Sequence, residues 1–155
     1  MDTSVYDKIK HLLDGCKIEY TISVHEPVRT SKEAARIRGT DISTGAKAMV
    51  VKANNTYCLC VLPADKKLDW KKVEAVLGVK NARLATIDEA QSVTKVQVGG
   101  VPPLGNVMGL PTYFDESLLN IERVNFNAGL KTHSVSMLTK DLVKLVVPTI
   151  CLISL

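Results

Sequence analysis

The sequence predicts a mixed α/β protein, of the α+β type, in which helices surround one curved, mixed and largely antiparallel sheet or barrel. Patterns typical of strands fill the middle of the chain, and patterns typical of amphipathic helices occur between them. The chain has 155 residues, of which 46% are hydrophobic and 23% charged, and this is enough apolar surface for one buried core. We therefore expect residues 1–155 to form a single domain.

The first third of the chain predicts two helices with a strand between them. Apolar residues recur at helical spacing over residues 4–15. Residues 17–24 alternate in polarity, as a strand with one buried face does. A second helix is predicted over residues 30–39, because Thr30 precedes Glu33 by three positions, which is the capping-box pattern of a helix start.

The middle of the chain predicts a hairpin followed by two helices. Residues 47–63 hold two β-prone runs on either side of Asn54 and Asn55, which tolerate the left-handed backbone of a tight turn. A helix that opens on an aspartate cap is predicted over residues 68–78, and another over residues 86–93.

The last third predicts three strands, a helix and a closing strand. The strands are expected over residues 110–114, 121–127, 133–137 and 146–154, and the helix over residues 139–145. Strand patterns therefore dominate the middle of the chain, and helix patterns lie between them.

Composition argues against membrane and metal chemistry. No apolar run reaches the roughly 18–20 residues that span a bilayer, and the N-terminus lacks the basic-then-apolar order of a secretory signal. We expect a cytoplasmic protein with no membrane partner. Cys16, Cys58, Cys60 and Cys151 contain no CxxC pair, so we expect reduced, buried thiols and no metal. The net charge of +4 permits an anionic partner without requiring one.

Residues 98–106, VGGVPPLGN, form an unusual uncharged loop. Pro102 and Pro103 fix their own φ angles and restrict the residue before each of them, whereas glycines allow sharp bends or close approach. The N–H groups of Gly99 and Gly100 could then face a carbonyl or phosphate oxygen. The alternative is a stiff turn that joins two strands.

Five segments together resemble the YbaK/ProX family of aminoacyl-tRNA deacylases, the free-standing relatives of the editing domain of bacterial prolyl-tRNA synthetase. The segments occur in family order over residues 25–35, 45–52, 68–86, 98–118 and 127–142. Within them are the family signatures: a lysine that opens the first hairpin strand, Lys47, and the GxxP loop, Gly100-Val101-Pro102-Pro103. The resemblance implies hydrolysis of the ester bond between a wrongly attached amino acid, expected to be small, and a tRNA, with tRNA(Pro) one possible substrate.

The resemblance implies that Lys47, Gly99 and Gly100 are the catalytic positions, with no cofactor. Strand alternation places the Lys47 side chain with Met49 and Val51. Its ammonium could hold the terminal phosphate or ribose or orient the attacking water, although a lysine at a strand end is ordinarily just solvated. The backbone N–H groups of the two glycines would stabilise the oxyanion, so a side chain added at Gly100 should impair turnover more than stability.

Further positions are candidates for binding the aminoacyl-adenosine. They are Val101, Pro102, Pro103, Gly105, Met49, His25, Asn127, Gly129, His133 and Ser134. Of the two histidines, His133 is either a general base or a hydrogen-bonded structural residue, and His25 is either a family feature or a strand-end residue bonded to backbone.

Two basic clusters are candidates for tRNA phosphates. Arg29, Lys32 and Arg36 recur at helical spacing, and Lys71 and Lys72 are adjacent. Such clusters bind phosphates without reading bases, although most are simply solvated surface. With no RNA-reading motif present, we expect contact with the acceptor end of aminoacyl-tRNA and no DNA partner.

A second hypothesis is a non-catalytic module that binds tRNA or an aminoacyl-tRNA synthetase. Loss of Lys47 or of the loop glycines would favour that module, and all of them are present. Attack on the ester by the substrate's own side chain or ribose hydroxyl, instead of by water, is compatible with the same residues. The sequence identifies neither the amino acid nor the tRNA.

Overall fold

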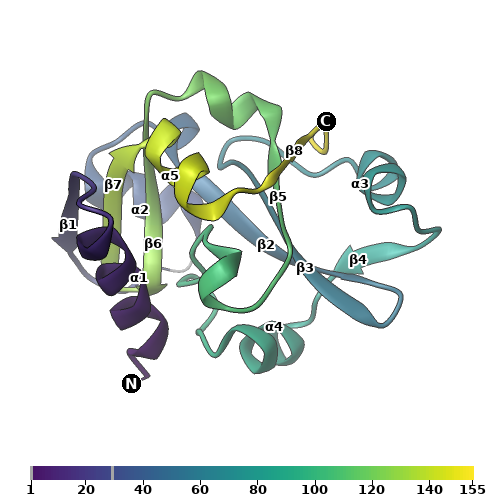
Figure 1. The fold of residues 1–155 in the computed structure, drawn as a ribbon, viewed down its shortest axis with the longest axis horizontal. Helices are drawn as coiled ribbons and strands as arrows, with labels where there is room; N and C mark the ends of the chain where they lie inside the picture. The colour runs from purple at the N-terminus through teal and green to yellow at the C-terminus, as the bar shows by residue number, and fades with distance from the viewer. Residues whose placement is uncertain (1, 29) are drawn as a thin grey trace.

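Helices and strands alternate along the chain in the computed structural model, which describes residues 2–28 and 30–155 (Figure 1). The helices of this part are α1 (Ser4–Gly15), α2 (Ser31–Arg38), α3 (Trp70–Leu77), α4 (Ile87–Thr94) and α5 (Thr139–Val146), with short 3-10 helices η1 (Ile42–Thr44), η2 (Gly105–Val107) and η3 (Glu116–Asn120). Its strands are β1 (Tyr20–Val24), β2 (Ala46–Ala53), β3 (Thr56–Pro63), β4 (Ala82–Leu84), β5 (Thr112–Asp115), β6 (Arg123–Leu130), β7 (His133–Leu138) and β8 (Thr149–Cys151). The predicted α+β class is confirmed.

The strands form two sheets, where the sequence suggested one curved sheet. One sheet is antiparallel in the order β1-β7-β6, and the other is mixed in the order β4-β2-β3-β5-β8. A single parallel bridge between Gly45 and Asn125 joins them. Beyond that bridge, α2 and the segment around Gly99 take the place of β6 beside β2, and a cavity lies among these three elements.

Two apolar clusters cover opposite faces of the five-stranded sheet. The larger cluster lies between the two sheets and takes in α1, which lies across the three-stranded sheet, and α5 (Figure 1). Its largest fully buried side chains include Phe114, Phe126 and Ile9. The smaller cluster joins Val51, Cys58 and other residues of the sheet to α3. Residues of β2 therefore alternate between two cores, which is why both faces of this strand are apolar.

Local end signals are confirmed at the helices. The Thr30 hydroxyl accepts a hydrogen bond from Glu33 N, and the Asp69 carboxylate accepts bonds from the first turn of α3. Gly39 ends α2 in the left-handed conformation, as a C-terminal glycine typically does. Asn54, at φ 56°, supplies the predicted left-handed residue of the β2–β3 turn. No described helix is long and apolar enough to cross a membrane.

The cysteines only partly follow the expectation of buried thiols. Cys58 and Cys60 are buried on one face of β3, as predicted. Cys151 is half-buried at the edge strand β8, and Cys16 is exposed, because it follows the end of α1 where the chain turns into solvent.

Asp115 fastens the C-terminal segment to the five-stranded sheet. Its carboxylate is 1% exposed and accepts hydrogen bonds from Ile153 N at 2.9 Å, Ser154 N at 3.0 Å and Ser154 Oγ at 3.1 Å, as well as from the Ser117 backbone and hydroxyl. Burial alone would raise the pKa of Asp115, but these hydrogen bonds outweigh it and hold the pKa below the ordinary 3.8.

We expect Asp115→Asn to destabilise the fold by about 2–3 kcal/mol, because the amide replaces an accepting oxygen with a donor that faces other donors. Chemical denaturation measures the effect, and Glu116→Gln at the exposed neighbouring carboxylate is the matched control. Since the folded-state pKa of Asp115 is lowered, its contribution is present above the unfolded pKa and is lost as the pH falls through the folded one. The difference between wild type and Asp115→Asn should therefore shrink below about pH 4. Equal stability of the two variants at neutral pH contradicts this role.

Candidate active site

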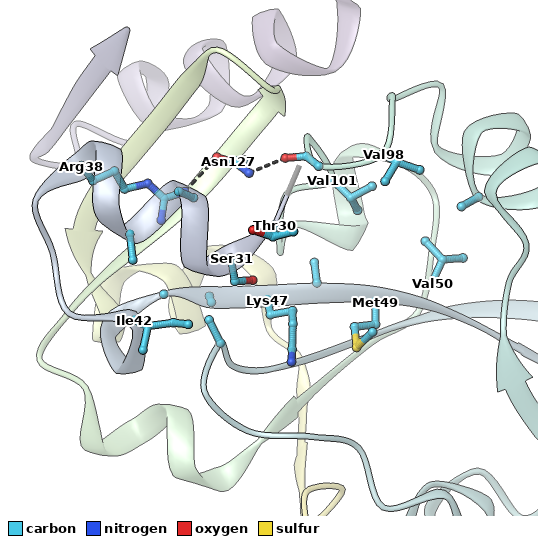
Figure 2. A pocket seen from close by; sticks show the side chains of 18 of the residues that line it. Thr30, Ser31, Arg38, Ile42, Lys47, Met49, Val50, Val98, Val101 and Asn127 are labelled. Carbon is cyan, nitrogen blue, oxygen red and sulfur yellow. Dashed lines mark hydrogen bonds between the residues drawn. The ribbon is translucent and has the colours of Figure 1, made fainter. Parts of the chain in front are cut away.

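A cavity of about 360 Å³ lies along one edge of β2 (Figure 2). Its walls are α2, the start of β2, the end of β4 and the segment 98–101. Of the residues predicted for the site, the structure brings these to the cavity: Lys47, Met49, Gly99, Val101 and Asn127. They come from three separate parts of the sequence and meet only through the fold.

The edge of β2 that borders the cavity is incompletely paired. β4 pairs with β2 only from Val51 to Ala53, and the Val50 carbonyl still accepts a bond from Ala85 N at 2.9 Å. Because backbone groups of alternate residues point to the same side of a strand, the N–H and C=O of Ala48 face the same edge beyond the last bond to the β4 segment. This edge offers the cavity a backbone donor and acceptor next to an alanine side chain.

Helix α2 presents small side chains to the cavity. Ser31, Ala34 and Ala35 line it, together with Arg38 at the last turn, at spacings that place all four on one face of the helix. The three small residues and Ala48 leave room for a ligand where larger residues would fill the space. The hydroxyl of Thr30, at the mouth of this face, is used to cap the helix.

The deepest polar part of the cavity is a hydrogen-bond network centred on Asn127. Arg38 Nη2 donates to Asn127 Oδ1 at 2.8 Å, and Arg38 Nε donates to Ser134 Oγ at 2.8 Å. Asn127 Nδ2 in turn donates to the carbonyl oxygen of Gly99 (Figure 2). His25 completes the network, because its Nε2 lies 2.7 Å from Ser134 Oγ. His25 and Ser134 thus support residues of the cavity without lining it.

The loop glycines differ from each other in their backbone hydrogen bonds. Gly100 N–H donates to the Gln97 carbonyl at 2.9 Å, so the prediction that it is an open oxyanion donor is wrong. Gly99 lines the cavity at φ 93°, a conformation that favours glycine. In the part of the chain that the structure describes, the N–H groups of Gly99 and Val101 have no acceptor. They replace the Gly99–Gly100 pair as the candidate donors to a carbonyl oxygen.

The structure does not bring the rest of the loop to the cavity. Pro102 and Pro103 are buried beneath it. Gly105 begins η2 and is packed so closely on Thr112 that a Cβ there would overlap the Thr112 hydroxyl. These three positions were predicted to bind substrate, but they stiffen the loop and fix its ends, as the turn alternative expected.

The position of Gly100 corrects the prediction that a side chain there would spare stability. A Cβ would lie 3.0 Å from Val96 Cγ1 and 3.2 Å from the Leu130 backbone, in a buried site. We expect Gly100→Ala to cost about 1–3 kcal/mol of folding free energy through overpacking, measured by thermal or chemical unfolding. Gly15→Ala is the control, since nothing lies within 4 Å of a Cβ at that position. Equal melting of the two variants would contradict the close packing.

Lys47 borders the cavity, but its ammonium is held outside the polar network. Figure 2 shows the side chains of Lys47 and Met49 directed to the opposite side of β2 from Val101 and Asn127, as strand alternation requires. Lys47 Nζ donates to the Lys66 carbonyl at 2.6 Å. Burial lowers the pKa of Lys47; the charge of Asp65 opposes this shift, and that of Lys67 adds to it.

Gly129 and His133 lie on the far side of the three-stranded sheet, against α1. His133 stacks edge-on against Tyr6 with ring centroids 4.8 Å apart, and its Nδ1 lies 2.7 Å from the Thr132 hydroxyl. At Gly129, at φ 85°, a Cβ would lie 2.9 Å from Tyr6 N, so glycine is needed for the close approach of α1. The structure therefore does not bring these two predicted substrate-binding residues to the cavity, and the structural alternative for His133 is the one observed.

The predicted phosphate-binding residues are exposed at two places. Lys32 and Arg36 lie on the outer side of α2, whose inner face lines the cavity, whereas Arg29 lies outside the described residues. Lys71 and Lys72 begin α3, and Lys72 Nζ donates to the Ser154 carbonyl at 2.9 Å. Only the first of these places adjoins the cavity wall.

Sequence reasoning missed Arg38, Ala34 and Ala35 as cavity residues. Their spacing on the predicted helix could have indicated a cavity wall, because it forms a face of small residues that ends in arginine. Such a face is unsuited to burial in an apolar core. The sequence did not reveal that this face meets Asn127, since that contact joins residues 89 positions apart.

Comparisons with known proteins place this chain among proteins of aminoacyl-tRNA editing. The profile of the family described as the aminoacyl-tRNA editing domain matches residues 25–145. A relative from Escherichia coli K12, the multifunctional Ser/Thr-tRNA deacylase ProXp-y, is 31% identical over 92% of this chain and 89% of its own length. The prolyl-tRNA editing protein ProX of Acetoanaerobium sticklandii is 26% identical over 94% of this chain and 93% of its own. The crystal structure of hypothetical protein APE2540 superposes with a TM-score of 0.87 at 25% identity, over 96% of this chain and 99% of that one.

Proposed function

The chain belongs to the aminoacyl-tRNA editing domain family, and from this premise we propose that it is a trans-editing deacylase of mischarged aminoacyl-tRNA. Its substrate is the ester that joins an amino acid to the terminal adenosine of a tRNA. The observation that carries the proposal is the cavity at the edge of β2, where the N–H groups of Gly99 and Val101, which have no acceptor among the described residues, adjoin a wall of small side chains.

The proposed reaction needs only backbone donors and a positioned water. The N–H groups of Gly99 and Val101 bind the ester carbonyl oxygen and stabilise the oxyanion that forms when water attacks the carbonyl carbon. The bond between that carbon and the ribose oxygen then breaks. The amino acid leaves with the oxygen of the water. One proton of the water passes to the leaving ribose oxygen, which becomes a hydroxyl, and the other is lost from the new carboxyl group to solvent. An aminoacyl ester is reactive enough for polarisation and positioning to suffice.

The small side chains in the cavity walls favour a small amino acid as the group that is removed from the tRNA. Ala34, Ala35 and Ala48 border a cavity of about 360 Å³ that the terminal adenosine and the aminoacyl group must share. The relative from Escherichia coli is named for serine and threonine, and the one from Acetoanaerobium sticklandii for prolyl-tRNA editing. We therefore propose alanine, serine and threonine as the first candidates and tRNA(Pro) as the first tRNA to test.

A deacylation panel tests the proposed function. The purified protein is incubated with tRNAs charged with alanine, cysteine, serine, threonine or proline, and the release of free amino acid is followed. Release of at least one small amino acid, with the correctly charged prolyl-tRNA(Pro) spared, is the expected result. If none is released, the non-catalytic module that binds tRNA or a synthetase becomes the better explanation.

Lys32 and Arg36 are proposed to bind tRNA phosphates, because they are exposed beside the cavity wall. We expect the double variant Lys32→Ala, Arg36→Ala to raise the KM for charged tRNA and to reduce its salt dependence, with the slope of log KM against log salt falling by roughly one to two. Cleavage of aminoacyl-adenosine, which has no phosphate, should not change. The control is Lys140→Ala, Lys144→Ala on α5, which removes equal charge from exposed positions outside the cavity. An unchanged salt slope would assign the first pair to solvated surface.

A further inference from the structure

We propose that Arg38 is a positioning residue, which acts through Asn127 to hold the Gly99–Gly100 peptide, next to the Gly99 N–H, in the orientation used for deacylation. The inference rests on the function proposed above, because it concerns the same cavity. Arg38 lines that cavity from the last turn of α2, and all of its described hydrogen bonds go to the side chains that support the loop.

Arg38 selects one orientation of the Asn127 side-chain amide. A guanidinium has only donors, so the asparagine must turn its oxygen toward Arg38, and Nη2 meets Oδ1 at 2.8 Å. The NH₂ group of Asn127 is then directed at the Gly99 carbonyl oxygen, to which it donates (Figure 2). The reversed amide would place NH₂ against the guanidinium and an oxygen against the Gly99 carbonyl, so both contacts would become repulsive.

The Asn127 bond is the side-chain anchor at Gly99, in a loop that is also held by backbone hydrogen bonds and by a contact of Val98 N with Gln91 Oε1 at 3.4 Å. Gly100 N–H donates to Gln97 at 2.9 Å, and the Gly100 carbonyl accepts from Gly129 N at 2.8 Å. Gly99 precedes these anchors, with φ at 93°, and its carbonyl is bound by Asn127. The Gly99 carbonyl and the Gly100 N–H belong to one peptide group, so loss of the correct amide orientation would leave that group held only through its N–H. Rotation of this group would shift the neighbouring peptide group that carries the Gly99 N–H.

The charge of Arg38 has no structural counterpart in the described part of the chain. No carboxylate there lies within ion-pair distance of it, and burial lowers the pKa of its guanidinium to about 10, so it remains charged at neutral pH. A partly buried charge without an ion-pair partner is unfavourable for folding, and in Arg38→Met the relief of this cost offsets part of the loss of the two hydrogen bonds to Ser134 and Asn127. A residue whose partly buried charge is unfavourable for folding is a candidate for a functional role.

Ser134 contacts the guanidinium of Arg38, and His25 contacts Ser134. Ser134 Oγ accepts from Arg38 Nε at 2.8 Å and lies 3.2 Å from Asn127 Oδ1. His25 holds the serine through Nε2, while its Nδ1 lies 2.8 Å from the Glu26 carbonyl. The planar fork of Arg38 is therefore fixed on two sides, a geometry that lysine cannot reproduce.

A double-mutant cycle on a phosphate-free substrate tests the proposal. We expect Arg38→Met to lower kcat for aminoacyl-adenosine about tenfold with little change in KM, as for loss of a residue that orients a contacting group. Asn127→Ala should lower kcat at least as much. Because the two act in series, the double variant should be no slower than Asn127→Ala alone. Arg38→Lys should restore little activity, and Arg123→Met, at an exposed guanidinium on the same strand as Asn127, should behave as wild type.

Three results would overturn the proposal: normal kcat in Arg38→Met, losses that multiply in the double variant, or a loss confined to charged tRNA. The last would mean that Arg38 binds a substrate phosphate. Amide NMR separates this inference from the proposed function. The backbone resonances of Gly99, Gly100 and Val101 should shift alike in Arg38→Met and Asn127→Ala, whether or not the wild type deacylates any tRNA. Unshifted resonances in Arg38→Met would also overturn the positioning role.

Discussion

Lys47→Ala is expected to lower the deacylation rate about a hundredfold or more while the protein stays folded, which is the scale for loss of a preorganised charged contact to a transition state. Lys47 borders the cavity, and a single described hydrogen bond, to the Lys66 carbonyl, holds its ammonium. A flexible four-carbon side chain with one backbone tether can exchange that carbonyl for a ribose or phosphate oxygen of the substrate. We propose this exchange as its role, in place of proton abstraction.

The folding free energy of Lys47→Ala should change by no more than about 1 kcal/mol, because Lys47 is half-buried and lies outside both apolar clusters. Single-turnover deacylation and chemical denaturation on the same samples measure the two effects. Lys47→Met keeps the apolar stem and should be as slow as Lys47→Ala, and Lys47→Arg should restore little, since a planar guanidinium differs from a compact ammonium. Lys10→Ala, on the exposed side of α1, is the control. Wild-type rates in Lys47→Ala would leave the reaction to the loop N–H groups and the substrate's own hydroxyls.

The helices and the hairpin could be predicted because their signals are local. Thr30 caps α2 through Glu33 N three residues away, and Gly39 ends the same helix, so the pattern and the contact lie within one short segment. Asn54 likewise sets its turn without help from the rest of the chain. β4 was missed because three residues offer too little alternation to recognise.

The division into two sheets could not be predicted, because it depends on contacts between distant segments. The bridge from Gly45 to Asn125 joins residues that no local pattern relates. Strand alternation predicts which side of β2 the Lys47 side chain takes, but not that the cavity opens along the strand edge.

The candidate site was predictable as a set of segments but not in the role of each residue. Gly99 and Gly100 are the same residue type, yet the Gln97 carbonyl accepts from the N–H of Gly100, whereas the N–H of Gly99 has no acceptor among residues 2–28 and 30–155. His133 is suited to general-base chemistry by its type, but a stack against Tyr6 places it on the far side of the sheet. Such choices are made by tertiary contacts, which a residue's type does not encode.

Gly99→Ala is expected to reduce deacylation about a hundredfold, because it disturbs the backbone donor proposed to stabilise the oxyanion. At φ 93°, an L side chain costs about 1–2 kcal/mol, and a change in φ that relieves this strain would rotate the Gly99 N–H relative to the Gly99 carbonyl, so the N–H could not keep its orientation while the Asn127 bond is kept. The effect should appear in kcat on aminoacyl-adenosine, where no tRNA contact contributes.

Gly109→Ala is the matched control, since Gly109 has φ +70° with nothing within 4 Å of a Cβ and does not line the cavity. Both variants should lose similar stability through the same backbone strain, but only Gly99→Ala should lose turnover. Equal activity of the two would remove Gly99 from the reaction and leave the Val101 N–H and the open edge at Ala48 as the donors to test.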